Sequence, residues 1–86
     1  MPSKEKGLVL VTGAAGFTGH HMVAEVAKAG FKVRATDVSS RHYGAMFEAL
    51  GVEFVKSDLT DREGLDKLLS GVNSVIHVAG IHDYST

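Results

Sequence analysis

Residues 8–19 read Leu-Val-Leu-Val-Thr-Gly-Ala-Ala-Gly-Phe-Thr-Gly, four apolar residues followed by glycines at 13, 16 and 19. The pattern predicts a buried strand, a tight turn and the start of a helix. We expect Gly13 to make the turn, Gly16 to let backbone N–H groups approach a phosphate, and Gly19 to let the helix pack closely on the strand. A helix N-terminus presents unpaired donors and partial positive charge to an anion. The stretch therefore predicts a nucleotide pyrophosphate site, the alternative being turn and packing glycines that bind no ligand.

Length and composition indicate one small domain. The chain has 86 residues, of which 44% are hydrophobic and 22% charged, as in ordinary globular proteins. A formal net charge of -1 gives no electrostatic reason to expect nucleic acid or an anionic membrane as a partner. There is no cysteine, which excludes disulfides and thiolate chemistry. No apolar run has the length of a signal peptide or a membrane span, so we expect a soluble, cytoplasmic protein.

Strands and helices are expected to alternate along the whole chain. The first strand is apolar at every position, which is typical of a parallel strand covered on both faces. Gly30, Gly51 and Gly71 each follow a predicted helix and precede an apolar residue, as a left-handed helix cap requires. The expected strands are 8–11, 31–37, 52–56 and 74–78, and the expected helices are 17–29, 41–50 and 61–69.

This order predicts an α/β fold of the Rossmann type, a half fold whose parallel sheet has strand order 3-2-1-4 and helices on both faces. In the second strand, Arg34 and Thr36 are expected on the polar side of the alternation. Ser39 or Ser40 is expected to cap the second helix, and Thr-Asp-Arg-Glu at 60–63 fits a capping box for the third. The fourth strand would present an apolar, unpaired edge, which favours self-association.

Asp37 ends the second predicted strand, 18 residues after Gly19. At about this spacing an acidic residue reaches the adenosine ribose of a dinucleotide. A carboxylate there accepts hydrogen bonds from the ribose hydroxyls and repels a 2′-phosphate, which favours NAD over NADP. Two alternatives stay open. Asp37 could cap a turn, and Arg34 or Arg41 could pair with a 2′-phosphate.

Four motifs together resemble the N-terminal half of an extended short-chain dehydrogenase/reductase. That group includes nucleotide-sugar epimerases and dehydratases and the 3-beta-hydroxysteroid dehydrogenase-like reductases. The motifs are Thr-Gly-Ala-Ala-Gly-Phe-Thr-Gly at 12–19, Asp37, Ser-Asp-Leu-Thr at 57–60 and His-Val-Ala-Gly at 77–80, in the order and spacing of the family. The resemblance implies that residues 1–86 are an NAD(P)-binding domain, the N-terminal part of a longer enzyme.

The resemblance also implies cofactor contacts by position. Asp58 and Leu59 would contact the adenine edge, and Val78, Ala79 and Gly80 would approach the cofactor near its ribose. The alternatives are a turn residue that precedes a helix for Asp58 and a plain loop for Ala79 and Gly80. With the glycine turn and the ribose carboxylate, the predicted cofactor-binding residues are Gly13, Gly16, Phe17, Thr18, Gly19, Asp37, Asp58, Leu59, Val78, Ala79 and Gly80.

The chain departs from the family where its catalytic residues would lie. The family's Tyr-x-x-x-Lys is absent, because Tyr43 is followed four residues later by Phe47 and Tyr84 lies two residues from the end. We therefore predict no catalytic residue in this chain. The implied role is NAD(H) binding for an oxidoreductase or an epimerase/dehydratase that transfers hydride and acts on a small-molecule substrate.

Other functions have less support in the residues. A non-catalytic NAD-sensing or interaction module stays open, and a Tyr-x-x-x-Lys downstream in the reading frame would favour the enzyme instead. A folded domain without any ligand is a weaker alternative. The glycines are not followed by Lys-Ser or Lys-Thr, which excludes an ATP or GTP P-loop. No metal site is predicted, since His20 and His21 are adjacent and diverge on a helix.

Overall fold

The computed structural model describes residues 7–57 and 62–78. Four parallel strands form one sheet in the order β3-β2-β1-β4. The predicted α/β fold and strand order are therefore confirmed. The elements are β1 (Leu8–Thr12), α1 (Phe17–Lys28), β2 (Lys32–Asp37), α2 (Gly44–Ala49), β3 (Glu53–Lys56), α3 (Arg62–Leu69) and β4 (Ser74–His77).

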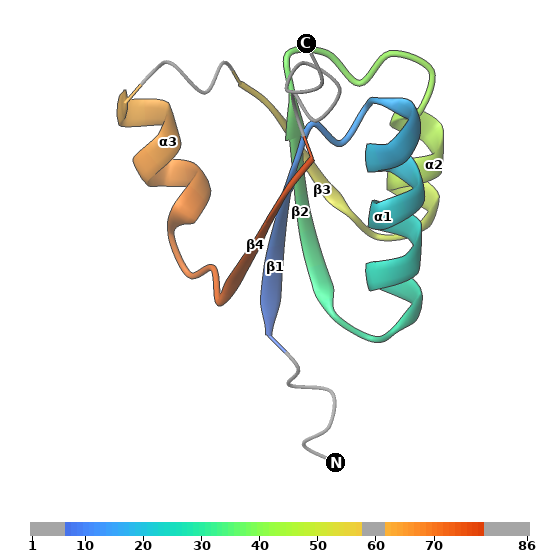
Figure 1. Cartoon of the computed structure of the whole chain (residues 1–86), viewed down its shortest axis with the longest axis horizontal. Helices are drawn as coiled ribbons and strands as arrows, with labels where there is room; N and C mark the ends of the chain where they lie inside the picture. The colour runs from blue at the N-terminus through green and yellow to red at the C-terminus, as the bar shows by residue number, and fades with distance from the viewer. Residues whose placement is uncertain (1–6, 58–61, 79–86) are drawn as a thin grey trace, which may run out of the picture.

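The helices cover both faces of the sheet, with α1 and α2 on one side and α3 on the other (Figure 1). In β1, Val9 and Val11 join a buried cluster with Val23 of α1 and Phe47 of α2. Leu10 points to the opposite face, because side chains alternate along a strand, and is only 1% exposed. The unbroken apolar run of β1 thus follows from its place inside the sheet with helices on either side.

Three glycines end the helical segments as predicted. Gly30, Gly51 and Gly71 have φ of 100°, 73° and 76°, the left-handed region that favours glycine. The chain can therefore reverse into the next strand within a few residues of each helix. None of the helices among the described residues combines the length and the apolarity needed to cross a membrane.

The start of α2 differs from the prediction. The helix begins at Gly44 rather than 41, and neither Ser39 nor Ser40 caps it, since its N-cap residue is Tyr43 without a side-chain hydrogen bond. Instead, the hydroxyl of Ser39 accepts the Arg41 N–H at 3.0 Å, and Arg41 has a positive φ of 51°. The serine closes a local turn, and that turn delays the helix. The first two residues of the predicted capping box at 60–63 lie outside the described residues.

In β2 the polar residue Thr36 is buried, although it lies on the polar side of the predicted alternation. Val33 and Ala35 are buried as expected, but Thr36 is also buried. Its hydroxyl donates a hydrogen bond to the Val55 carbonyl at 2.6 Å. A threonine can be buried at low cost when its hydroxyl has a partner, here the neighbouring strand β3.

Candidate functional site

The turn between β1 and α1 is held against the end of β2. Gly13 has φ 68°, as a tight turn requires. The Ala14 N–H donates to the Thr36 carbonyl at 3.1 Å, and the Gly16 N–H donates back to the Gly13 carbonyl at 3.2 Å. The glycine turn is therefore an ordered loop at the carboxyl ends of the two central strands, β1 and β2.

Gly19 and Gly16 serve the turn in different ways. A Cβ atom on Gly19 would collide with the carbonyl oxygen of Gly13, so the close packing predicted for this glycine is present. A Cβ on Gly16 would lie 3.5 Å from the same oxygen, an ordinary contact, and Gly16 has φ -82°. The chain's own packing thus requires glycine at 19 but not at 16.

The N-terminus of α1 is open. Gly16 is its N-cap residue, no side chain caps the helix, and its first turn holds no acidic residue. Within the part of the chain that the structure describes, the amides of Phe17, Thr18 and Gly19 donate no backbone hydrogen bond. The Phe17 side chain is 75% exposed. Three donors and the positive end of the helix dipole are therefore available to an anion at this edge of the sheet.

Asp37 lies against the glycine turn. One carboxylate oxygen, Oδ2, accepts the Ala15 N–H at 2.9 Å, and the other, Oδ1, accepts the Val38 N–H at 2.7 Å. The residue is half-buried. The turn-capping alternative for Asp37 is therefore observed. Each carboxylate oxygen keeps a further lone pair that can accept a hydrogen bond from a hydroxyl group.

His20 joins the turn to Tyr43 at the start of α2, a role that its sequence position beside His21 did not predict. Its Nδ1 lies 3.1 Å from the Gly16 carbonyl oxygen. A carbonyl can only accept, so Nδ1 carries the proton of this hydrogen bond. The His20 ring stacks on Tyr43, with centroids 4.0 Å apart and planes at 9°. The only available signal was its position four residues after Gly16.

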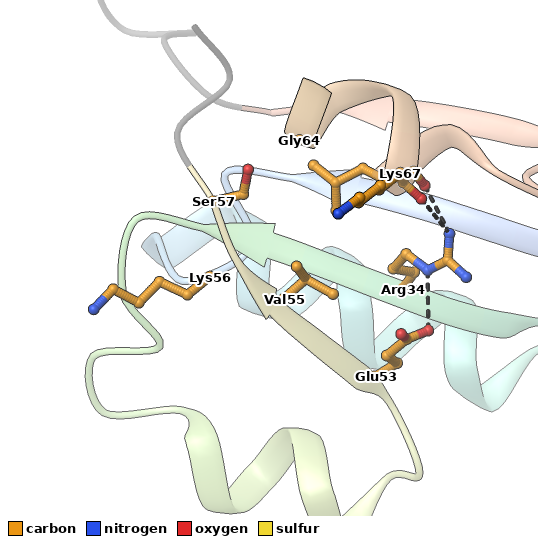
Figure 2. Close-up of a pocket in the computed structure, with 8 residues that line it drawn as sticks. Arg34, Glu53, Val55, Lys56, Ser57, Gly64 and Lys67 are labelled. Atoms are coloured by element: carbon orange, nitrogen blue, oxygen red, sulfur yellow. Dashed lines mark hydrogen bonds and ion pairs between the residues drawn. The ribbon is translucent and has the colours of Figure 1, made fainter. Parts of the chain in front are cut away.

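Arg34 points away from the glycine turn. Its Nη1 donates to the carbonyls of Leu68 and Ser70 at 2.8 and 2.9 Å, where α3 ends. Its Nε donates to Glu53 at 2.9 Å, and Figure 2 shows the guanidinium between the two groups. The suggestion that Arg34 could pair with a 2′-phosphate is therefore wrong, because its guanidinium group binds the backbone carbonyls at the C-terminal end of α3. Arg41 is exposed.

A cavity of about 420 Å³ lies between β3 and α3, on the face opposite α1. Figure 2 shows Lys56 extending outward from this cavity. None of its lining residues belongs to the predicted cofactor set. A pyrophosphate held at a helix N-terminus needs exposed backbone donors, and no residue of the α1 N-terminus lines this cavity. The lining residues are Arg34, Glu53, Val55, Lys56, Ser57, Gly64, Lys67 and Leu68.

The end of β4 reaches the same edge as the glycine turn. The Val78 N–H donates to the Thr12 carbonyl at 3.1 Å, and the Thr12 hydroxyl lies 2.6 Å from Nδ1 of His77.

In the described ranges no three His, Cys, Asp or Glu side chains gather as a metal site would need. The structure thus brings seven predicted residues to one edge, namely Gly13, Gly16, Phe17, Thr18, Gly19, Asp37 and Val78. The other four, Asp58, Leu59, Ala79 and Gly80, lie outside the described residues.

Known proteins resemble this chain along nearly its whole length. Residues 5–86 match the NmrA-like family. A ceramide reductase of Caulobacter vibrioides is 37% identical over 81 residues, which cover 94% of this chain and 25% of the reductase. UDP-glucose 4-epimerase 4 of Oryza sativa subsp. japonica is 33% identical over 84 residues, which cover 85% of this chain and 23% of the epimerase. The chain therefore spans about a quarter of the length of these relatives.

Solved structures share the fold. A short-chain dehydrogenase/reductase superfamily protein from Agrobacterium tumefaciens, solved with bound NAD, is 33% identical with a TM-score of 0.68, over 84% of this chain and 20% of its own. The protein AtPrR2, solved with NADP+ and (+)pinoresinol, is 23% identical with a TM-score of 0.77, over 92% of this chain and 28% of its own. The second likeness concerns the fold alone.

Proposed function

Since this chain belongs to the NmrA-like family, with relatives among the short-chain dehydrogenases/reductases and the NAD-dependent epimerases, we propose that it binds a nicotinamide dinucleotide at the carboxyl edge of its sheet. One observation carries the proposal. The open N-terminus of α1 and the Asp37 carboxylate flank the same glycine turn. An anion donor site beside a carboxylate suits a pyrophosphate joined to a ribose.

The pyrophosphate would lie over the turn. The free amides of Phe17 and Thr18 would donate to its oxygens, and the missing side chain of Gly16 would leave space for it. Gly13 and Gly19 would act indirectly, by shaping the turn and setting the distance between β1 and α1. The His20 hydrogen bond to the Gly16 carbonyl would steady the N-cap.

NAD is the preferred cofactor in this proposal. Asp37 would accept hydrogen bonds from the adenosine ribose hydroxyls and repel a 2′-phosphate. The engagement of Arg34 with α3 supports this preference, because it removes one of the two arginines that a 2′-phosphate could have used. Asp58 and Leu59 would contact the adenine edge, and Val78, Ala79 and Gly80 would approach the cofactor near its ribose, as the family resemblance implies.

The chemistry would belong to a longer protein. Relatives include a reductase and a 4-epimerase, and a nicotinamide dinucleotide supplies hydride transfer when bound. This chain would position the cofactor without turnover, because its sequence has no Tyr-x-x-x-Lys. The substrate would be a small molecule held by residues outside these 86. An NAD-sensing or interaction module is the second candidate, and a cytoplasmic location stays a prediction.

The free edge of β4 would also take a second copy of this chain. β4 is an edge strand in the described sheet, and Val75 is 50% exposed. An exposed apolar edge strand offers unpaired backbone groups to another strand. We therefore expect the isolated chain to self-associate through this edge.

Amide NMR spectra recorded during an NAD titration would test the cofactor proposal. We expect the signals of residues 13–19 and of Asp37 and Val38 to shift, because these amides surround the turn. Signals from Glu53 and Lys67, which line the cavity on the other face, should stay in place. Shifts confined to the cavity would contradict the proposed site.

A further inference from the structure

We infer that Asp37 is also a positioning residue for the glycine turn, so that its carboxylate sets the geometry of the pyrophosphate site even for a nucleotide without ribose hydroxyls. The inference rests on the proposed function, because it concerns how that same site is built. It separates two roles of one carboxylate, which are binding the ribose and ordering the loop.

The end of β2 holds two consecutive amides of the turn. The Thr36 carbonyl accepts the Ala14 N–H at 3.1 Å, and the Asp37 carboxylate accepts the Ala15 N–H at 2.9 Å. Ala15 is only 1% exposed. A buried amide that loses its partner is costly, so the carboxylate has a direct effect on how residues 14–16 lie.

The carboxylate is itself fixed in orientation. Its second oxygen accepts the Val38 N–H at 2.7 Å, so both oxygens are held by backbone donors. Hydrogen bonds to a charged acceptor are stronger than those between neutral groups. Each oxygen keeps a lone pair for a ribose hydroxyl, so loop ordering and ribose binding are compatible in one side chain.

Asparagine distinguishes the two roles. An amide side chain has one acceptor and one NH₂ group, and both backbone partners of Asp37 are donors. In Asp37→Asn, one N–H would therefore face a donor, and the turn would lose one of its anchors. The same amide could still exchange hydrogen bonds with ribose hydroxyls, so a ribose-only role predicts a milder effect.

The test uses titration calorimetry to measure the affinity of two nucleotides for the wild-type chain and for Asp37→Asn. The nucleotides are ADP and 2′,3′-dideoxy-ADP, which has no ribose hydroxyls for Asp37 to bind. We expect Asp37→Asn to bind 2′,3′-dideoxy-ADP about tenfold more weakly than the wild type. Equal affinities for this ligand would overturn the inference, because Asp37 would then act only through the hydroxyls. The control Asp66→Asn removes an exposed carboxylate on α3 and should change neither affinity.

Amide hydrogen exchange on the unsubstituted chain gives an independent readout. We expect the Ala15 amide to exchange more slowly than the amide of Phe17, which has no backbone partner among the described residues. Fast exchange at Ala15 would contradict the inference even if Asp37→Asn failed to fold. If the wild type binds neither nucleotide, the proposed function fails, while slow Ala15 exchange that becomes fast in Asp37→Asn would still support the positioning role.

Discussion

The carbonyl oxygen of Gly13 faces Gly19 so closely that no side chain fits between β1 and α1. We expect Gly19→Ala to lower the free energy of unfolding by about 3 kcal/mol, because an added methyl must push backbone rather than a flexible side chain. Urea unfolding followed by circular dichroism measures the change. Gly16→Ala is the matched control and should stay within about 1 kcal/mol of the wild type. Equal losses in the two variants would contradict the packing role of Gly19.

Substitution of Gly16 tests where the pyrophosphate binds. Its Cβ position makes only an ordinary contact with the Gly13 carbonyl, so a small side chain should leave the fold intact. We expect Gly16→Val to abolish detectable NAD binding, because the side chain would occupy the space assigned to the pyrophosphate. The measurement is a calorimetric titration of a variant whose circular dichroism matches the wild type. Unchanged affinity would mean that the phosphate lies elsewhere.

Arg34 should stabilise the crossover from β3 to β4. We expect Arg34→Met to cost about 2 kcal/mol of unfolding free energy, because the carbonyls that end α3 lose a charged donor and the positive charge that favours a helix C-terminus. The control Glu53→Gln removes only an ion pair whose acidic partner is 59% exposed, and should cost less than about 1 kcal/mol. A larger loss in Glu53→Gln than in Arg34→Met would show that the ion pair, rather than the helix end, carries the stabilisation.

Hydrophobic periodicity and glycine spacing predicted the sheet, its strand order and the helix ends, because these depend on local pattern and on the handedness of crossovers. The start of α2 could not be predicted, since a serine hydroxyl has two local options and Ser39 caps a turn instead of the helix. The partners of Arg34 and Asp37 are set by the register between strands and by the placement of α3. Arg34 and Glu53 are 19 positions apart and Ala15 and Asp37 are 22 apart, and the spacing of residues in one sequence does not show that such pairs meet.

Cofactor preference should depend on Asp37. We expect Asp37→Ala to lower the ratio of NAD affinity to NADP affinity, because the variant neither binds the ribose hydroxyls nor repels a 2′-phosphate. Parallel calorimetric titrations with the two cofactors give this ratio. Arg41→Ala tests the remaining arginine, and a selective loss of NADP affinity would assign it to the 2′-phosphate. An unchanged ratio in Asp37→Ala would place the ribose contact on another residue.

Self-association should depend on the edge of β4. Val75 is half-exposed on this strand, and a lysine there opposes pairing of apolar edges. We expect light scattering to show dimers or larger species for the wild type at high concentration and fewer for Val75→Lys. Lys67→Ala, on an exposed position of α3, should leave the distribution unchanged. A clean wild-type monomer would argue against the interface.

Calorimetric titration of the chain with NAD, NADP and ADP-ribose tests the central claim most directly. We predict saturable binding of NAD and ADP-ribose and weaker binding of NADP, because the glycine turn and Asp37 contact the half that NAD and ADP-ribose share. Absence of binding by all three, in a sample whose circular dichroism shows it to be folded, would contradict the proposed cofactor site.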